Sequence, residues 1–210
     1  MKLDIIYNED SLIGMKRLPN DSIDMMLTDP PYAEKYQSLW YPLGIESKRL
    51  LKIGGSFISL CGHYQLPFVL NVLSKSLRYW WICGMEHTGN LKRLPGKWVA
   101  IRWKPAVWFV KERRRLNDCN CPIDLYSGGT IRKAQNAKVA HIWGQPLDWF
   151  EHYIERLTKK GDIVLDPFIG SGTTAVACKR LNRHYIGFEI NKEYCQIAEQ
   201  RLEAEKTLWD

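Results

Sequence analysis

The chain has 210 residues, of which 45% are hydrophobic and 25% are charged, and its formal net charge is +7. This length suits one α/β domain with a single sizeable core, and the basic balance suits a polyanionic partner. No apolar run approaches ~18 residues and no charged-then-apolar leader opens the chain, which disfavours a membrane span and a signal peptide. The six cysteines show no disulfide framework and no zinc spacing, so we expect a reducing, cytoplasmic protein without a metal site.

The first expected elements lead to an acidic turn. We expect a strand over residues 3–6 and a helix over residues 11–18, and the apolar run at residues 23–28 predicts a buried strand. Asp29-Pro30-Pro31-Tyr32 follows that strand directly. An acid at the carboxyl end of such a strand lies where open α/β sheets keep their active sites. The two prolines remove two backbone donors and fix two φ angles, so we expect a rigid turn.

Such a turn could hold a planar aromatic amine. The Asp29 carboxylate and a fixed carbonyl would each accept one amine hydrogen, and the Tyr32 ring would stack on the attached heterocycle. The alternative is a strand that simply ends in a proline turn. Residues 33–41 follow, and we expect them to form a mobile loop that can close on a substrate.

The middle of the chain combines expected sheet elements with basic and aromatic residues. The expected elements are a helix at 42–52, a strand at 56–61 after Gly54-Gly55, a helix at 65–73, and strands at 79–83 and 105–110. Basic residues that can follow a nucleic-acid backbone are Arg93, Lys97, Arg113, Arg114, Arg132 and Lys133, with Lys104 among their neighbours. Trp98, Trp103 and Trp108 are interleaved with them. The alternative is a solvated charged face beside core tryptophans, and we expect Trp103 and Trp108 to lie in the core.

A glycine-rich turn dominates the last third of the chain. We expect, in order, a helix at 150–157, a strand at 163–165, a turn at 166–174, a helix at 175–181, a strand at 184–188 and a last helix capped by Asn191. Gly170, Gly172 and Ala175 fit the G-x-G-x-x-G/A spacing, and Glu189 stands about 20 residues further on. The glycines let the backbone approach a ligand, and the acid accepts hydrogen bonds from a ribose diol. The spacing leaves the nucleoside open, because a nicotinamide dinucleotide and S-adenosylmethionine both carry an adenosine ribose.

The two motifs together resemble those of the amino-group DNA methyltransferases, which methylate adenine or cytosine at the exocyclic nitrogen. The order, with the catalytic motif first, is similar to that of the beta group of this family. By this resemblance the catalytic residues are Asp29, Pro30, Pro31 and Tyr32. The implied cofactor-binding residues are Asp29, Asp166, Pro167, Phe168, Gly170, Ser171, Gly172, Thr173, Thr174 and Glu189. The resemblance covers residues 3–62 and 141–203, and it leaves open whether Phe168 contacts the cofactor ring or the core.

Smaller matches extend the resemblance. Asp10 and Ser11 stand where the family has an acid-serine pair, so Asp10 would contact the adenine side of the cofactor, although either residue also suits a helix cap. His141 begins a segment that matches the family's methionine-end motif at only three positions. The family's lysine is absent there, and Gln145 is the substitute we expect.

The resemblance implies a Rossmann-like α/β fold, with a mostly parallel, doubly wound sheet. One domain would span residues 1–210, with a target-recognition segment at roughly 84–140. S-adenosylmethionine would be the cofactor, and double-stranded DNA would be the partner. The protein could form a homodimer, and its source would be bacterial or viral. Asp29 and the Pro30 carbonyl would draw the amine nitrogen toward tetrahedral geometry, after the base has flipped out of the duplex.

Adenine is the expected base, because catalytic motifs that begin with aspartate are commoner in the adenine enzymes of this family. Cytosine is the alternative, although serine is more usual at that position in cytosine enzymes. Two other classes remain. A nicotinamide-dependent oxidoreductase would explain residues 163–189 but not the turn at Asp29. A catalytically silent DNA-binding module is the other class, but both motifs are intact, which argues against it.

Overall fold

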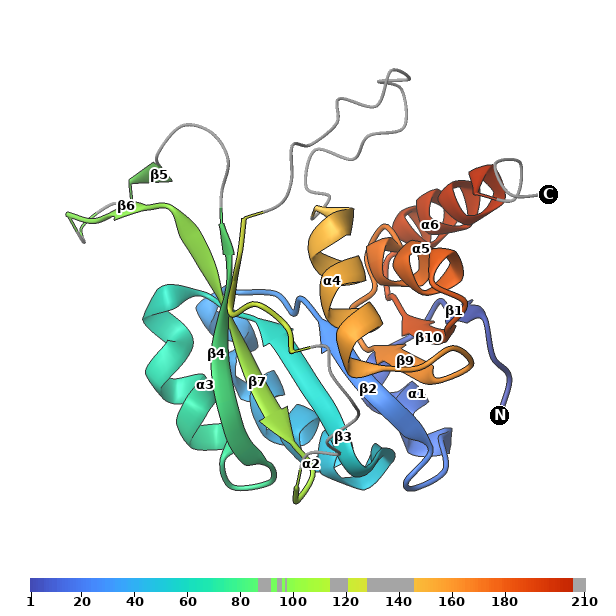
Figure 1. Cartoon of the computed structure of the whole chain (residues 1–210), viewed down its shortest axis with the longest axis horizontal. Helices are drawn as coiled ribbons and strands as arrows, with labels where there is room; N and C mark the ends of the chain where they lie inside the picture. The colour runs from blue at the N-terminus through green and yellow to red at the C-terminus, as the bar shows by residue number, and fades with distance from the viewer. Residues whose placement is uncertain (87–91, 94–95, 97, 114–120, 128–145, 206–210) are drawn as a thin grey trace.

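The computed structural model describes residues 1–86, 92–93, 96, 98–113, 121–127 and 146–205. An eight-stranded sheet runs through the molecule, with helices against both faces (Figure 1). Its strands are β1 (Ile5–Tyr7), β2 (Ile23–Thr28), β3 (Leu51–Leu60), β4 (Arg78–Glu86), β7 (Trp103–Val110), β8 (Leu125–Tyr126), β9 (Ile163–Asp166) and β10 (His184–Phe188). The α-helices are α1 (Ser11–Gly14), α2 (Trp40–Leu50), α3 (Leu66–Leu73), α4 (Leu147–Leu157), α5 (Thr173–Arg180) and α6 (Lys192–Ala204).

The strand order in the sheet is β1-β10-β9-β2-β3-β7-β4-β8. The first five of these strands pair in parallel, whereas β7 runs antiparallel to both β3 and β4. Parallel strands covered on both faces are apolar along most of their length, and in β2 every side chain except Asp24 is buried. The expected mostly parallel α/β sheet is therefore confirmed.

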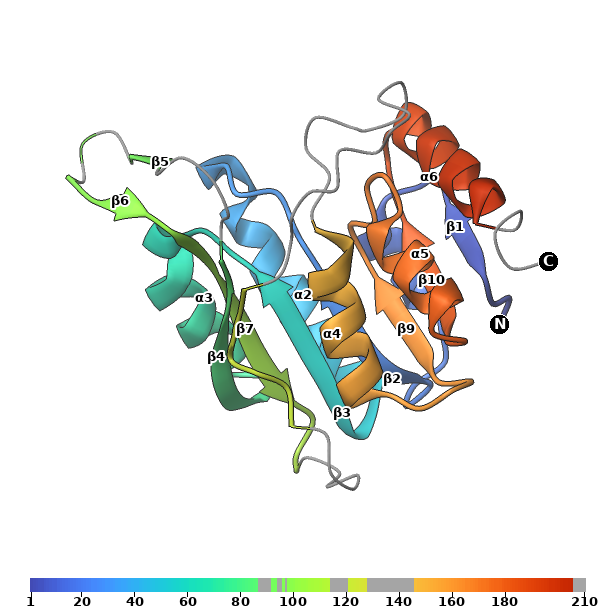
Figure 2. The same cartoon turned by 45° about the horizontal axis from the view of Figure 1, so that its top comes forward.

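Two hydrophobic cores lie on opposite faces of the sheet. One core packs α4 and α5 on the sheet through residues such as Trp149, Tyr153 and Val176. The other packs the α1 region, α2 and α3 through residues such as Trp40 and Val69. Figure 2 shows the helices as separate layers on either side of the strands. Among the described helices, none combines the length and apolar character needed to cross a bilayer.

Several expected elements have boundaries that differ by a few residues, the helix expected at 11–18 is α1 followed by the 3-10 helix η1 (Met15–Arg17), and two segments differ more strongly. Strand β3 begins at Leu51, so Gly54-Gly55 lies inside it rather than before it. Its register against β2 shifts between Ile23 and Met25, and Gly54 has a φ of +83°, which together mark a bulge. Residues 33–41 are not a loop, because the short 3-10 helix η2 (Glu34–Leu39) leads directly into α2.

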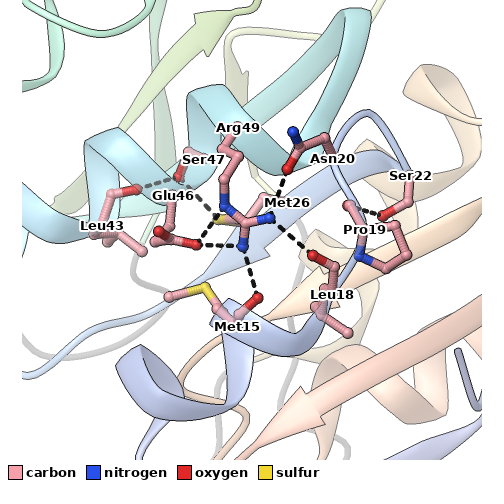
Figure 3. Close-up of polar contacts among 10 residues, drawn as sticks. All are labelled: Met15, Leu18, Pro19, Asn20, Ser22, Met26, Leu43, Glu46, Ser47 and Arg49. Atoms are coloured by element: carbon pink, nitrogen blue, oxygen red, sulfur yellow. Dashed lines mark hydrogen bonds and ion pairs between the residues drawn. The ribbon is translucent and has the colours of Figure 1, made fainter.

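Arg49 fixes the turn that precedes β2 (Figure 3). Its guanidinium, near the end of α2, donates to the Glu46 carboxylate at 3.0 and 2.6 Å. It also donates at 2.8 Å to the Met15 carbonyl, the Leu18 carbonyl and the Asn20 side chain. Because five donors in one planar fork reach both α2 and the chain before β2, these two segments are held together at the amino ends of β2 and β3. These contacts do not involve the carboxyl ends of β2 and β3.

A small ribbon extends from the sheet beyond β4 and β7. Its strands are β5 (Lys92–Arg93) and β6 (Ala100–Ile101), and they pair antiparallel. Figure 2 shows the ribbon projecting away from the helical layers. Trp98 lies between its two strands and is 98% exposed.

Candidate active site

The two predicted motifs lie side by side at the carboxyl ends of neighbouring strands. β2 and β9 pair in parallel, with Met25 opposite Val164 and Met26 opposite Leu165. Asp29 follows β2 and Asp166 ends β9, so both acids stand at the same edge of the sheet. This is the edge at which open α/β sheets bind their ligands. Residues 137 positions apart in sequence thus contribute to one site.

Asp166 joins the two motifs from within the protein. Its carboxylate is 3% exposed. It accepts hydrogen bonds from the Thr28 hydroxyl at 2.6 Å, the Phe168 amide at 3.0 Å and the Thr174 hydroxyl. Burial raises the pKa of Asp166 to about 6, while these hydrogen bonds act in the opposite direction. Because Thr28 immediately precedes Asp29, the bond to Thr28 ties the glycine-rich turn to the acidic turn.

Two glycines in the turn after β9 have different uses. Gly170 has a φ of +51°, and a Cβ built on it would meet nothing within 4 Å, so a ligand can approach the backbone there. Gly172 has a φ of +83°, and its Cβ would lie 2.7 Å from the Ala198 Cβ of α6. The first glycine therefore leaves open space beside the turn, and the second allows α5 and α6 to pack closely.

Arg201 of α6 supports the same turn. One of its nitrogens donates to the Ser171 carbonyl at 2.6 Å, to the Ser171 hydroxyl at 3.1 Å and to the Thr173 hydroxyl at 3.2 Å. Burial lowers the pKa of Arg201 from its ordinary value. Arg201 could not be identified from the sequence, because nothing in the periodicity of the last helix shows which cation faces the turn.

Glu189 ends β10 and faces the glycine-rich turn. Its carboxylate accepts from the Gly170 amide at 3.0 Å and from the Asn191 amide at 2.7 Å, one bond on each oxygen. A carboxylate has about four acceptor positions, so this half-buried group keeps capacity for a diol. The Asn191 side chain caps α6 as expected, since it accepts from the Glu193 and Tyr194 amides.

Asp10 caps the first helix. Its side chain accepts from the Leu12 amide at 2.7 Å while the residue stays exposed, and Ser11 beside it is buried. The cap that the sequence suggested is confirmed. A single bond from Leu12 also leaves acceptor positions on the Asp10 carboxylate.

The acidic turn is held by residues that follow the neighbouring strand β3. The Tyr32 carbonyl accepts from the Tyr64 hydroxyl at 3.0 Å and from the Gln65 amide nitrogen at 2.6 Å. Both residues belong to the 3-10 helix η3 (His63–Gln65) after β3. The sequence analysis assigned no role to either of them. Among the described residues, the buried Tyr32 hydroxyl and the Gln65 side-chain oxygen have no hydrogen-bond partner, which leaves polar capacity in the wall of this turn.

Lys104 of β7 reaches the same turn. Its ammonium lies 3.2 and 3.1 Å from the two Asp29 carboxylate oxygens. It also lies 4.4 Å from the centre of the Tyr32 ring. The sequence placed Lys104 only among the basic residues of the middle segment. No local pattern could connect it with Asp29, because the contact depends on β7 lying antiparallel beside β3.

The expected nucleic-acid residues are only partly described. Arg113 is exposed just after β7, and Arg93 lies in β5. Lys97, Arg114, Arg132 and Lys133 lie outside the described residues, as do His141 and Gln145 of the expected methionine-end segment. Trp108 is buried as expected, but Trp103 is only half-buried, with its ring edge-to-face against His63 at 5.0 Å.

The buried cysteines in the described part of the chain are poorly suited to act as nucleophiles. Cys61, Cys83, Cys178 and Cys195 are buried free thiols, as the sequence suggested, and Cys121 is exposed. Cys61 follows β3 near Asp29 and Lys104, and burial raises the pKa of its thiol to about 12. A thiol that stays protonated at neutral pH is a poor nucleophile. The arrangement therefore suits direct transfer between two bound reactants.

Comparison with known proteins identifies the family. A sequence model described as DNA methylase, N6_N4_Mtase, matches residues 23–200. The type II methyltransferase M2.DpnII of Streptococcus pneumoniae is 44% identical, over 96% of this chain and 90% of that protein. The type II methyltransferase M.HpaI of Haemophilus parainfluenzae is 27% identical, over 93% of this chain and 73% of that protein.

Solved structures agree with that match. The M1.HpyAVI–SAM complex superposes with a TM-score of 0.75 at 27% identity, covering 94% of this chain and 98% of that chain. The cytosine-N4-specific PvuII DNA methyltransferase shares the fold, with a TM-score of 0.78 at 22% identity over 93% of this chain and 85% of that chain. The family model covers most of the chain and includes both turns. The chain therefore belongs to the N6_N4_Mtase family of S-adenosylmethionine-dependent DNA methyltransferases.

Proposed function

We propose that this DNA methyltransferase methylates the exocyclic amine of adenine in double-stranded DNA, with the base flipped out of the duplex. The observation that carries the proposal is the position of Asp29 and Tyr32 beside the glycine-rich turn, at one edge of the sheet. A carboxylate and an aromatic ring close to a nucleoside-binding turn can hold the base and the methyl donor in one crevice. Placing two reactants together in this way lowers the barrier by up to ~7–11 kcal/mol at best.

The turn after β9 fits S-adenosylmethionine. Gly170 leaves open space beside its backbone, and the Glu189 carboxylate keeps acceptor capacity next to it for the ribose diol. Asp10, exposed at the start of α1, would contact the adenine side. When bound, the cofactor supplies a methyl group on a positively charged sulfur. Asp166 would act on it only indirectly, because that carboxylate is filled by the protein's own donors.

Asp29 and the Pro30 carbonyl activate the amine in this proposal. The amine of adenine is a poor nucleophile, since its lone pair is delocalised into the ring. Two acceptors, one for each amine hydrogen, pull the nitrogen toward tetrahedral geometry and localise the lone pair. Asp29 is suited to this because its side chain is 19% exposed, open enough to meet a base and closed enough to exclude most water.

Tyr32 stacks on the flipped base. Hydrogen bonds from Tyr64 and Gln65 fix its carbonyl, so the backbone that carries the ring is held before a base arrives. Stacking on an aromatic side chain contributes ~1–3 kcal/mol per base.

DNA is the partner that suits the charge and the exposed aromatic residue. The formal net charge is +7. Arg93 of β5 and the exposed Trp98 lie in the ribbon that precedes the start of β7, whereas Arg113 follows the opposite end of that strand. Because β7 lies inside the sheet, the part of residues 84–140 that would read DNA is the β5–β6 ribbon and its neighbours. Phosphate contacts by such cations supply affinity without a sequence code.

Adenine is preferred to cytosine because the acidic turn begins with aspartate. In the family that this chain resembles, aspartate there is commoner in adenine enzymes and serine in cytosine enzymes. The PvuII enzyme, whose fold is similar, is cytosine-N4-specific, so fold alone does not choose the base.

Nucleoside mass spectrometry tests the proposal. Unmethylated plasmid is incubated with the protein and S-adenosylmethionine and then digested to nucleosides, with Asp29→Ala as the matched inactive control. N6-methyladenine that is present with wild type and absent with the control is the expected result. N4-methylcytosine would keep the mechanism and change the base. Methylation of single-stranded but not duplex oligonucleotides would replace double-stranded DNA by single-stranded DNA as the substrate. Enzymes that modify a base either act on single strands or flip the base out of a duplex. Cofactor binding without any methylated nucleoside would contradict the proposed activity.

A further inference from the structure

Lys104 is held in place by the strand that carries it. It lies near the start of β7, opposite Met85 of β4. On the other side, the Cys61 amide donates to the Pro105 carbonyl at 3.0 Å. The backbone at Lys104 is therefore fixed by both neighbouring strands, and its ammonium approaches the acidic turn from a rigid support.

The ammonium touches both functional side chains of that turn. It lies within 3.2 Å of each Asp29 oxygen and 4.4 Å from the centre of the Tyr32 ring. The side chains of Lys104 and Asp29 are 13% and 19% exposed, so water screens the ion pair only partly. A carboxylate accepts at about four positions, and a lysine shared between both oxygens leaves room for an amine hydrogen.

Within the part of the chain that the structure describes, the other titratable groups around Asp29 do not supply this positive charge. Asp166 of β9 is a like charge when it is ionised, and its interaction with Asp29 is repulsive. The Cys61 thiol after β3 is kept neutral by burial, and burial also lowers the pKa of His63 on η3, which favours its neutral ring. Lys104 is thus the cation that opposes the charge of Asp29 among these neighbours.

We propose that Lys104 is a positioning residue that keeps the Asp29 carboxylate oriented and ionised throughout the reaction, so that Asp29 accepts a hydrogen bond from the target amine without taking its proton. This rests on the proposed role of Asp29. In the transfer, the nitrogen lone pair forms the new bond to the methyl carbon, and the carbon–sulfur bond breaks with its electron pair left on sulfur. The proton of the resulting ammonium then goes to water. An opposite charge at this distance favours the ionised carboxylate, which makes Asp29 a poor final proton acceptor.

The direct test is a carboxyl titration that needs no activity. The protein is labelled with ¹³C at aspartate side chains, and Asp29→Asn identifies the Asp29 signal. In Lys104→Met the Asp29 signal is expected to titrate ~1–3 pH units higher than in wild type. Lys104→Arg, which keeps the charge, is expected to titrate close to wild type. Lys104→Gln repeats the neutral substitution with a polar side chain, in case the methionine variant does not fold.

Lys111 supplies a matched control. It follows the other end of β7 and pairs with Asp21 at 2.6 Å, and its side chain is 12% exposed, almost the same as that of Lys104. Lys111→Met should leave the Asp29 titration unchanged. An Asp29 signal that titrates alike in wild type, Lys104→Met and Lys104→Gln would overturn the proposal, as would an equal shift in Lys111→Met.

Methyl-transfer rates give an independent readout. Lys104→Met is expected to slow single-turnover transfer ~100-fold, because a small misplacement of a reacting group has an effect of that size. The acid limb of its pH profile should move upward with the Asp29 titration, and Lys104→Arg should restore it. If wild type methylates no DNA, the proposed function fails, while the carboxyl titration still decides whether Lys104 controls Asp29.

Discussion

The two Asp-Pro turns of this enzyme begin alike and are used differently. Asp29-Pro30 directly follows β2. In Asp166-Pro167, Asp166 is the last residue of the neighbouring strand β9. The Asp166 carboxylate is 3% exposed and accepts three hydrogen bonds from the protein's own groups. The Asp29 side chain is 19% exposed and contacts Lys104. The same dipeptide at the same edge of one sheet therefore gives an internal support in one place and a ligand-facing acceptor in the other.

This difference depends on what stands opposite each acid. Thr28 and Thr174 supply hydroxyls to Asp166 and close its surroundings. Asp29 meets a strand that carries a lysine, in a turn fixed through the carbonyl of Tyr32. A buried acid that is fully satisfied can only position its neighbours, whereas a partly exposed acid with spare acceptor positions can act on a ligand.

Removing the carboxylate of Asp29 tests the difference between the two acids most strongly. Asp29→Ala should lower methyl transfer ~1,000-fold or more, since loss of one polar group that acts on the transition state already has an effect of ~10²–10³. S-adenosylmethionine affinity by calorimetry should change little, because the glycine-rich turn and Glu189 remain. Asp29→Asn, which keeps one acceptor oxygen, should retain more activity than Asp29→Ala. Wild-type rates in Asp29→Ala would refute the proposed mechanism.

Asp166→Ala should act on stability first. It leaves the Thr28 and Thr174 hydroxyls and the Phe168 amide without an acceptor, in buried or part-buried positions, so we expect a loss of ~2–4 kcal/mol in the free energy of unfolding. Urea unfolding measures this loss. If stability is unchanged while activity falls, Asp166 acts on the ligand rather than on the protein.

The pH dependence of the same residue sharpens this assignment. The pKa of Asp166 is raised from 3.8 to about 6 in the folded protein. The folded state therefore binds more protons than the unfolded state between these two values, and this group's contribution to stability falls as pH rises through that window. Relative to Asp166→Asn, wild type should lose roughly 2 kcal/mol between pH 4 and pH 7. A constant difference across that range would contradict the burial of this carboxylate.

The sequence predicted the parts of this site that depend on local pattern. Apolar runs that end in Asp-Pro identified the ends of β2 and β9, and the glycine spacing identified the turn before α5. The expected loop at residues 33–41 was wrong, because a 3-10 helix of only six residues has too little periodicity to be recognised. The start of β3 was misplaced because Gly54-Gly55 suggests a turn, while a bulge allows both glycines within the strand.

The residues that the sequence could not place act across the sheet. Lys104, Gln65 and Arg201 each reach a turn far from their own position in the chain. Their contacts depend on strand order and on which side of a strand faces the site. No spacing within a segment carries that information. Long-range polar contacts of this kind follow from the fold and not from local propensity.

Glu189→Ala should have an intermediate effect, confined to cofactor binding. Loss of a charged hydrogen-bond acceptor has an effect of ~1.5–3 kcal/mol, so S-adenosylmethionine affinity should fall ~10–100-fold. The Gly170 amide also loses its partner, which loosens the glycine-rich turn. Glu189→Gln keeps one acceptor oxygen and is the control for this loosening. Calorimetry measures both variants. Unchanged affinity in Glu189→Ala would remove this residue from the cofactor site.

The smallest effect is expected at Cys61, and it decides whether the acidic turn needs a nucleophile. Cys61 is fully buried near Asp29 and Lys104, and the raised pKa of about 12 keeps its thiol protonated at neutral pH. Cys61→Ala should keep methyl transfer within about threefold of wild type, with a stability loss of ~1 kcal/mol from the small cavity. A single-turnover assay and urea unfolding measure the two quantities. A loss of activity as large as that in Asp29→Ala would show that the thiol takes part, and the turn would then act through more than its acceptor oxygens.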